Sequence, residues 1–146
     1  MSEEGRDALR ALLRDRQVRR MKEFTQHGDT TTYDHCLRVA SLSDAINRRL
    51  RLHADERTLL TGAMLHDFYL YDWHEKNAGH RLHGFTHPLR AAENAKARFG
   101  VDARVEHVIV CHMWPLTLTR LPRTREAWIV CLADKWCSLG EILARR

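Results

Sequence analysis

The chain has few of the residues that end strands in tight turns. Only seven glycines and three prolines occur among 146 residues, whereas hydrophobic residues make up 44% of the chain. A sheet-rich fold needs many tight turns, and those turns depend largely on glycine and proline. The composition therefore favours helices. The length fits one globular domain that spans residues 1–146 and buries a single core.

Two kinds of targeting segment are also missing. No apolar run approaches the roughly 20 residues that a membrane-spanning helix needs. The N-terminal sequence Met-Ser-Glu-Glu-Gly is acidic and polar, whereas a signal peptide begins with basic residues and continues with apolar ones. We therefore expect a cytoplasmic protein that does not contact a membrane.

The four cysteines do not form a recognisable motif. They occupy positions 36, 111, 131 and 137, so the chain has no CxxC pair. In a cytoplasmic chain this spacing predicts reduced core thiols rather than a framework of disulfides.

The net charge of the chain gives only weak information about its binding partners. The formal net charge is +5, and this basic excess suits an anionic substrate as well as it suits solvated lysine and arginine side chains. Residues 3–26 are predicted to form a basic helix, with Leu9, Leu12 and Leu13 at helical spacing. For this helix, a solvated basic face whose leucines pack on the bundle is favoured over contact with nucleic acid or with a partner subunit.

Five more helices are predicted after a break at Gly28 and Asp29. Polar residues that cap helices, or that start them, precede each apolar repeat. Pro88 falls in the first turn of its helix, where proline is tolerated. On the last helix Ile129, Leu132, Ala133 and Trp136 form one stripe, and Trp128 and Trp136 are predicted to lie in the core. The expected ranges are about 32–50, 55–70, 86–99, 102–113 and 124–143, which gives an all-α bundle of about six helices.

The ten histidines are the unusual feature of the composition. The dipeptide His66-Asp67 is weak evidence alone, since such pairs arise by chance. An ordered set is more informative, because its members fall on different predicted helices or helix ends and some lie on apolar faces. Buried imidazoles and carboxylates without partners are costly, and a pair of divalent metals would neutralise them. Nitrogen and carboxylate ligands suit Fe, Mn, Zn, Co or Ni. The set is His35, His66, Asp67, His87, His112 and Asp134.

The sequence around these residues resembles the HD-domain superfamily, whose pattern is H…HD…H…H…D on a bundle of at least five helices. The resemblance covers about residues 28–140, which leaves residues 1–26 as a helix flanking this HD core. It is carried by the strings TTYDHCLRVA, GAMLHDFYLYDW, HGFTHPLRAAENA, CHMWPLT and VCLADKWCSL.

The resemblance implies a metal site with two ions, Fe or Mn being favoured. By this resemblance, the first ion is bound by His35, His66, Asp67 and Asp134. Asp67 would bridge to a second ion held by His87 and His112. His83 precedes His87 by four residues and His107 precedes His112 by five, so either could exchange roles with its neighbour.

The polar, histidine-rich segment 71–86 is long for a loop in a domain of this size, and such loops are often functional. Its cationic and imidazole side chains are candidates for an anion-binding lid, with His83 preferred as general acid or phosphate contact. Lys135 could reach a substrate phosphate or only pack its stem, and Arg38 could point at the mouth of the site or into solvent. The remaining lid candidates are His74, Lys76, His80 and Arg81, with Trp73 and Trp114 favoured as packing residues.

The expected function is hydrolysis of a phosphoester or phosphoanhydride, such as that of a nucleotide, by hydroxide formed on the two metals. The superfamily includes nucleotide and cyclic-dinucleotide phosphodiesterases and dinucleoside-polyphosphate hydrolases. Two alternatives stay open. One is a mixed-valence di-iron oxygenase, which uses the same ligands, and the other is a non-catalytic module that metal stabilises.

Overall fold

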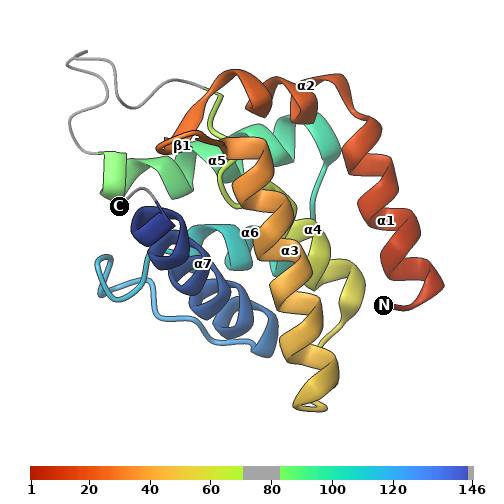
Figure 1. The fold of residues 1–146 in the computed structure, drawn as a ribbon. Helices are drawn as coiled ribbons and strands as arrows, with labels where there is room; N and C mark the ends of the chain where they lie inside the picture. The colour runs from red at the N-terminus through yellow and green to blue at the C-terminus, as the bar shows by residue number, and fades with distance from the viewer. Residues whose placement is uncertain (71–82, 145–146) are drawn as a thin grey trace.

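The computed structural model describes residues 1–70 and 83–144, apart from the side chains of residues 27 and 83–85. The described part is all-α, as predicted, with one two-stranded antiparallel sheet as its exception (Figure 1). The helices are α1 (Glu3–Arg14), α2 (Arg16–Arg19), the 3-10 helix η1 (Arg20–Glu23), α3 (Thr32–Arg49), α4 (Glu56–Leu65), α5 (His83–Phe99), α6 (Ala103–Cys111) and α7 (Arg125–Ala144). The strands are β1 (Thr25–His27) and β2 (Thr30–Thr31).

The single helix predicted over residues 3–26 is wrong. The chain leaves the helical conformation at Asp15, which has an extended backbone with φ −69° and ψ 135°. The Asp15 carboxylate accepts hydrogen bonds from the backbone N–H groups of Gln17 and Val18, so it ends α1 and starts α2. The chain then turns through η1 into β1, which pairs with β2 on the other side of Gly28 and Asp29.

Polar caps start three of the later helices as predicted. The side chain of Thr31 accepts from the N–H of Asp34 at the start of α3. Asp55 does the same for Thr58 in α4, and Asp102 caps α6. Each cap satisfies a backbone donor that the first turn of a helix leaves without an internal partner.

Two predicted helix boundaries differ from the structure. The third predicted helix ends at Leu65 instead of about residue 70, and Leu70 has a left-handed backbone with φ 57°, which a helix cannot contain. The fourth begins at His83, before the predicted start near Thr86, so Pro88 lies inside α5. A proline there removes one backbone donor and keeps a φ compatible with the helix.

Helix α4 lies at the centre of the core. Leu59, Ala63 and Leu65 are fully buried, and the helix contacts α1, α3, α6 and α7. Gly62 lets α6 approach closely, because a Cβ atom built at this position would lie 2.5 Å from Cγ1 of Val108. This central position places the C-terminal end of α4, where His66 and Asp67 lie, among the other helices.

The apolar stripe predicted on α7 is only partly buried. Ile129 and Ala133 lie in the core, but Leu132 is 57% exposed, Trp136 is 71% exposed and Trp128 is 36% exposed. The reason is that α7 is apolar almost all round, and the face that packs on the bundle carries Val130 and other residues of a different stripe.

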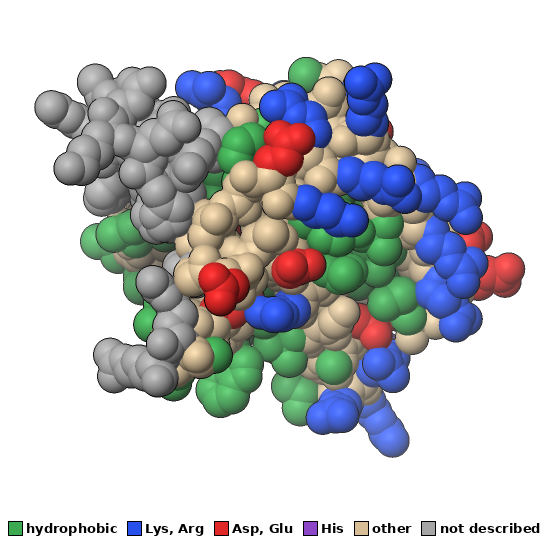
Figure 2. Space-filling view, turned by 45° about the horizontal axis from the view of Figure 1, so that its top comes forward, with side chains coloured by type: hydrophobic (Ala, Val, Ile, Leu, Met, Phe, Trp, Pro, Cys, Tyr) green, Lys and Arg blue, Asp and Glu red, His purple; other side chains and the backbone are tan. Residues whose placement is uncertain are grey.

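The basic N-terminal helix packs as expected, with Leu9 and Leu12 buried and Arg6 and Arg10 exposed. Lysine and arginine side chains gather on the right of Figure 2, the side on which α1 lies in Figure 1. Among the described residues, no helix is long and apolar enough to cross a membrane.

Candidate metal centre

The structure brings the six predicted ligands together in the interior. His35 lies on α3, His66 and Asp67 at the end of α4, and His87 on α5. His112 follows α6, and Asp134 lies on α7. All six are buried, the most exposed being Asp134 at 7%. The side chains form two groups that share Asp67.

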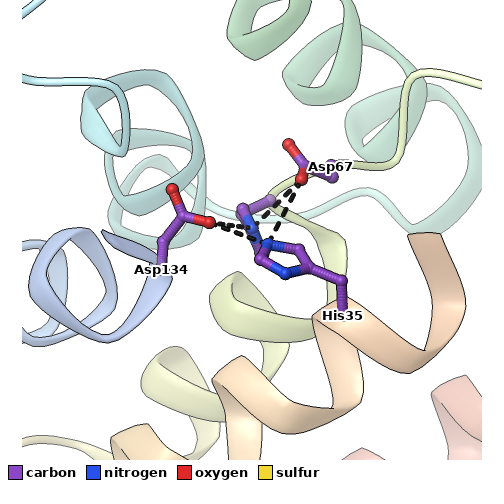
Figure 3. A group of neighbouring side chains, drawn as sticks. His35, Asp67 and Asp134 are labelled. Atoms are coloured by element: carbon purple, nitrogen blue, oxygen red, sulfur yellow. Dashed lines mark hydrogen bonds and ion pairs between the residues drawn. The ribbon is translucent and has the colours of Figure 1, made fainter. Parts of the chain in front are cut away.

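The first group surrounds one oxygen of each carboxylate. Nε2 of His35 lies 2.8 Å and Nε2 of His66 lies 3.2 Å from Oδ1 of Asp134. The same two nitrogens lie 3.7 and 3.3 Å from Oδ2 of Asp67. Figure 3 shows the ring of His35 pointing between the carboxylates of Asp67 and Asp134.

The second group surrounds the other oxygen of Asp67. Nε2 of His87 and Nε2 of His112 lie 3.2 and 3.3 Å from Oδ1 of Asp67. The two nitrogens lie 2.8 Å from each other. The two oxygens of one buried carboxylate therefore face two separate sets of imidazole nitrogens.

Backbone carbonyls orient two of the rings in the same way. Nδ1 of His66 donates to the carbonyl of Ala63 at 2.6 Å, and Nδ1 of His112 donates to the carbonyl of Ile109 at 2.7 Å. Both histidines cap the C-terminus of a helix, where the last carbonyls have no partner within the helix. Because Nδ1 carries a hydrogen, the neutral form of each ring has the lone pair of Nε2 toward the centre.

A carboxylate that sequence analysis missed holds the third ring. Nδ1 of His35 lies 2.9 and 3.0 Å from the two oxygens of Glu141, which is 6% exposed. Nη1 of Arg38 donates to the same carboxylate at 3.3 Å while its side chain stays 56% exposed. A signal was present, since Glu141 follows Asp134 by seven residues, two turns of one helix.

The structure adds a second missed residue, Gln26 of β1. Its Nε2 donates to Oδ2 of Asp67 at 3.0 Å, and the side chain is 8% exposed. Its Oε1 accepts from the hydroxyl of Tyr69 at 2.9 Å. No pattern in the sequence distinguishes this glutamine, because it lies on a short strand that was predicted as helix.

Opposite charges dominate the electrostatics of the first group. Burial lowers the pKa of His35, but hydrogen bonds to Asp134 and Glu141 outweigh it and raise the pKa to about 10. For His66, too, burial is opposed by the charge of Asp67, and the pKa rises well above its ordinary value. Burial raises the pKa of both aspartates, yet the neighbouring histidines hold each pKa well below the usual range.

In the second group, Asp67 offsets the effect of burial on His112 only in part. Burial lowers the pKa of His112, so this ring favours its neutral form, the form that binds metals. Oδ1 of Asp67 has no hydrogen bond within the described residues, although it is buried. Two atoms that each bind a common ion at about 2.1 Å lie roughly 3.0 to 3.4 Å apart. The observed spacings are close to this range, so the residues present fit a divalent cation in each group.

The other predicted site residues lie outside these two groups. Nζ of Lys135 donates to the carbonyl of His112 at 3.0 Å and lies 3.2 Å from Sγ of Cys131. His107 accepts from the N–H of Arg123 and lies 3.4 Å from Sγ of Cys111, so His112 and not His107 faces Asp67. Trp114 packs against Trp128 with ring centroids 5.1 Å apart.

Some predictions fall on residues that the structure does not describe. Residues 71–82, with the lid candidates Trp73, His74, Lys76, His80 and Arg81, lie outside the described residues, and so does the side chain of His83. The exchange of roles between His83 and His87 therefore stays open, although His87 does face Asp67.

Comparison with known proteins agrees with the geometry. The family model for the HD domain matches residues 32–138, from the start of α3 to the last turns of α7. No curated protein and no solved structure matched the chain at significant similarity. The match covers most of the chain and includes all six clustered residues. The chain therefore belongs to the HD-domain family, whose members are in general metal-dependent hydrolases.

Proposed function

We propose that the chain is a metal-dependent phosphohydrolase with two divalent cations. One cation is held by His35, His66, Asp67 and Asp134, and the other by Asp67, His87 and His112. The observation that carries this proposal is the position of Asp67, whose two oxygens face the two groups of nitrogens. Membership of the HD-domain family supports it. Mixed nitrogen and carboxylate donors suit transition metals, and we favour Fe or Mn over Zn, Co and Ni.

The protein itself orients the candidate metal ligands and shields them from solvent. When bound, two divalent cations polarise a phosphoryl oxygen and lower the pKa of a water molecule. The carbonyls of Ala63 and Ile109 and the carboxylate of Glu141 fix the rings that would bind them. Such outer partners set the tautomer and the direction of a metal-binding histidine. Burial of the six side chains keeps competing solvent away from them.

We propose a phosphorylated small molecule, such as a nucleotide, as the substrate. The net charge of +5 favours approach of an anion. His83 begins α5 one turn before His87 and remains our candidate for general acid or phosphate contact. Lys135 remains a candidate too, but its ammonium group would have to exchange the carbonyl of His112 for a phosphate oxygen.

The test is metal-dependent hydrolysis by reconstituted protein. Metal-free protein is loaded with Mn²⁺, Fe²⁺, Co²⁺ or Zn²⁺ and assayed with bis(p-nitrophenyl) phosphate and a panel of linear and cyclic nucleotides. We expect hydrolysis that requires metal and is lost in Asp67→Ala. Asp7→Ala, which removes an exposed carboxylate of α1, should retain it. Circular dichroism establishes that both variants keep their helices.

Other outcomes would contradict the proposal. Oxygen uptake with an organophosphonate or a polyol, together with an Fe(II)/Fe(III) signal in electron paramagnetic resonance, would indicate a di-iron oxygenase. Bound metal with neither hydrolysis nor oxygen uptake would indicate a module that metal only stabilises.

A further inference from the structure

We propose that Gln26 is a positioning residue that fixes the rotation of the Asp67 carboxylate and so creates the second metal position. This inference rests on the proposed function, because it concerns how one side chain serves two cations. Gln26 lies on β1, outside the residues 32–138 that match the HD domain. The hairpin that β1 and β2 form thus reaches the centre of a site whose other residues lie on α3 to α7 or at their ends.

The hydrogen bonds of Gln26 leave its amide one orientation. Oε1 accepts from the hydroxyl of Tyr69 at 2.9 Å, and the hydroxyl of Thr32 lies 3.4 Å from it. Nε2 faces Oδ2 of Asp67 at 3.0 Å. A carboxylate only accepts, so turning the amide over would place two acceptors against each other. The carboxylate of Asp67 therefore selects this orientation of the amide, and the hydroxyl of Tyr69 holds Oε1 of Gln26 in it.

The bond to Oδ2 has a consequence for Oδ1. The carboxylate of Asp67 can rotate about the bond that joins it to Cβ, and this torsion has broad minima. With Oδ2 held by Gln26, Oδ1 is presented to Nε2 of His87 and His112. An oxygen has two lone pairs, so Oδ2 can accept from Gln26 and still bind a cation.

The two metal positions depend on Asp67 to different degrees. Among the described residues, the first group has three further candidate ligands, whereas the second has His87 and His112 besides Asp67. Loss of the fixed rotation of the Asp67 carboxylate should therefore weaken metal binding at the second position more than at the first. Replacement of an outer partner of a ligand typically lowers metal affinity about 10- to 100-fold. We expect Gln26→Leu to bind one cation as the wild type does and the other about 10- to 100-fold more weakly.

The experiment measures binding, not turnover. Metal-free protein is titrated with Co²⁺, and stoichiometry and affinities are followed by the visible absorption of the ion and by equilibrium dialysis. Gln17→Leu is the matched control, because Gln17 lies on α2 and its side-chain oxygen accepts a hydrogen bond from Nη1 of Arg20 at the surface. Tyr69→Phe removes the hydroxyl that orients Gln26, so a smaller loss at the same position is expected. In the double variant, Tyr69→Phe should add nothing to Gln26→Leu.

The outcomes separate this inference from the proposed function. Wild-type protein that binds fewer than two equivalents of Co²⁺ contradicts the two-metal site, and the inference with it. Wild-type protein that binds two equivalents while Gln26→Leu also binds two with unchanged affinity overturns the inference alone. If Gln26→Leu does not fold, Tyr69→Phe decides, and unchanged binding in that variant overturns the inference.

Discussion

Glu141 and His35 form a contact between the last turns of α7 and the first turns of α3, with Nδ1 of the imidazole 2.9 and 3.0 Å from the two carboxylate oxygens. Two turns earlier on α7, Asp134 contacts Nε2 of the same ring at 2.8 Å. His35 is thus held between two carboxylates of one helix. One of them is a proposed ligand, and the other fixes the ring.

The first prediction concerns this outer carboxylate. Glu141→Leu should lower the affinity of the first metal position about 10- to 100-fold, because the ring of His35 loses the partner that orients it. Metal titration of the purified variant measures the effect. Glu93→Leu replaces an exposed glutamate of α5 and should bind as the wild type does. Equal affinities in the two variants would contradict the role assigned to Glu141.

The second prediction is a dependence of stability on pH in the metal-free protein. Burial opposes a charged His35, but its hydrogen bonds to Asp134 and Glu141 raise the pKa to about 10. Because this pKa lies above the ordinary value of about 6.5, the stabilisation is complete below about pH 6.5 and is lost as pH rises through 10. The urea midpoint in the presence of a chelator should therefore fall across this window.

Metal reverses this trend. A cation binds only the deprotonated imidazoles, so its binding releases protons and tightens as pH rises. The increase in urea midpoint caused by Mn²⁺ should therefore grow between about pH 6.5 and about pH 8.5. His53→Ala removes an exposed histidine and should leave both trends in place. A metal-free midpoint that rises over this range would count against the ion pairs described for His35.

The third prediction contrasts two glycines in helices. Gly62→Ala should lower the free energy of unfolding by about 1 to 3 kcal/mol, since the new methyl group overlaps Val108 in a packed core. Gly140→Ala should raise it by roughly 0.5 to 1 kcal/mol, because alanine favours a helix and, apart from its chain neighbours and the backbone of α7, no described atom lies within 4 Å of a Cβ built there. Urea unfolding measures both. Val108→Ala should relieve part of the loss in Gly62→Ala, and failure to do so would show that the close approach is not its cause.

The fourth prediction tests the exposed face of α7. Trp136 is 71% exposed, so Trp136→Ala should change the free energy of unfolding by about 1 kcal/mol or less. Phe68, which is 1% exposed, is the buried counterpart, and Phe68→Ala should cost about 3 to 5 kcal/mol. Similar losses in the two variants would place Trp136 back in the core, where its sequence pattern had predicted it.

The sequence predicted most of the fold because its signals are local. Thr31, Asp55 and Asp102 cap their helices as their residue types indicate. The break at Asp15 had a local signal of the same kind, which the apolar spacing of the first helix obscured. Leu132 had no such signal, because α7 is apolar on most sides and only the tertiary packing selects its buried face.

The sequence predicted the candidate metal ligands but not the residues that orient them. The six clustered residues follow a family pattern, so their order in the chain was sufficient to place them together. Gln26 belongs to no such pattern, and the only signal for Glu141 is that it shares a helix face with Asp134. Their contacts depend on how α7 and the hairpin dock on α3 and α4, which only three-dimensional packing determines.

The position of the hairpin also bears on how the protein can be shortened. A fragment cut at the limits of the family match would keep residues 32–138 and all six clustered side chains. It would lose Gln26 at one end and Glu141 at the other. Domain boundaries chosen by family similarity would thus yield a chain with the full ligand set and without two side chains that orient it.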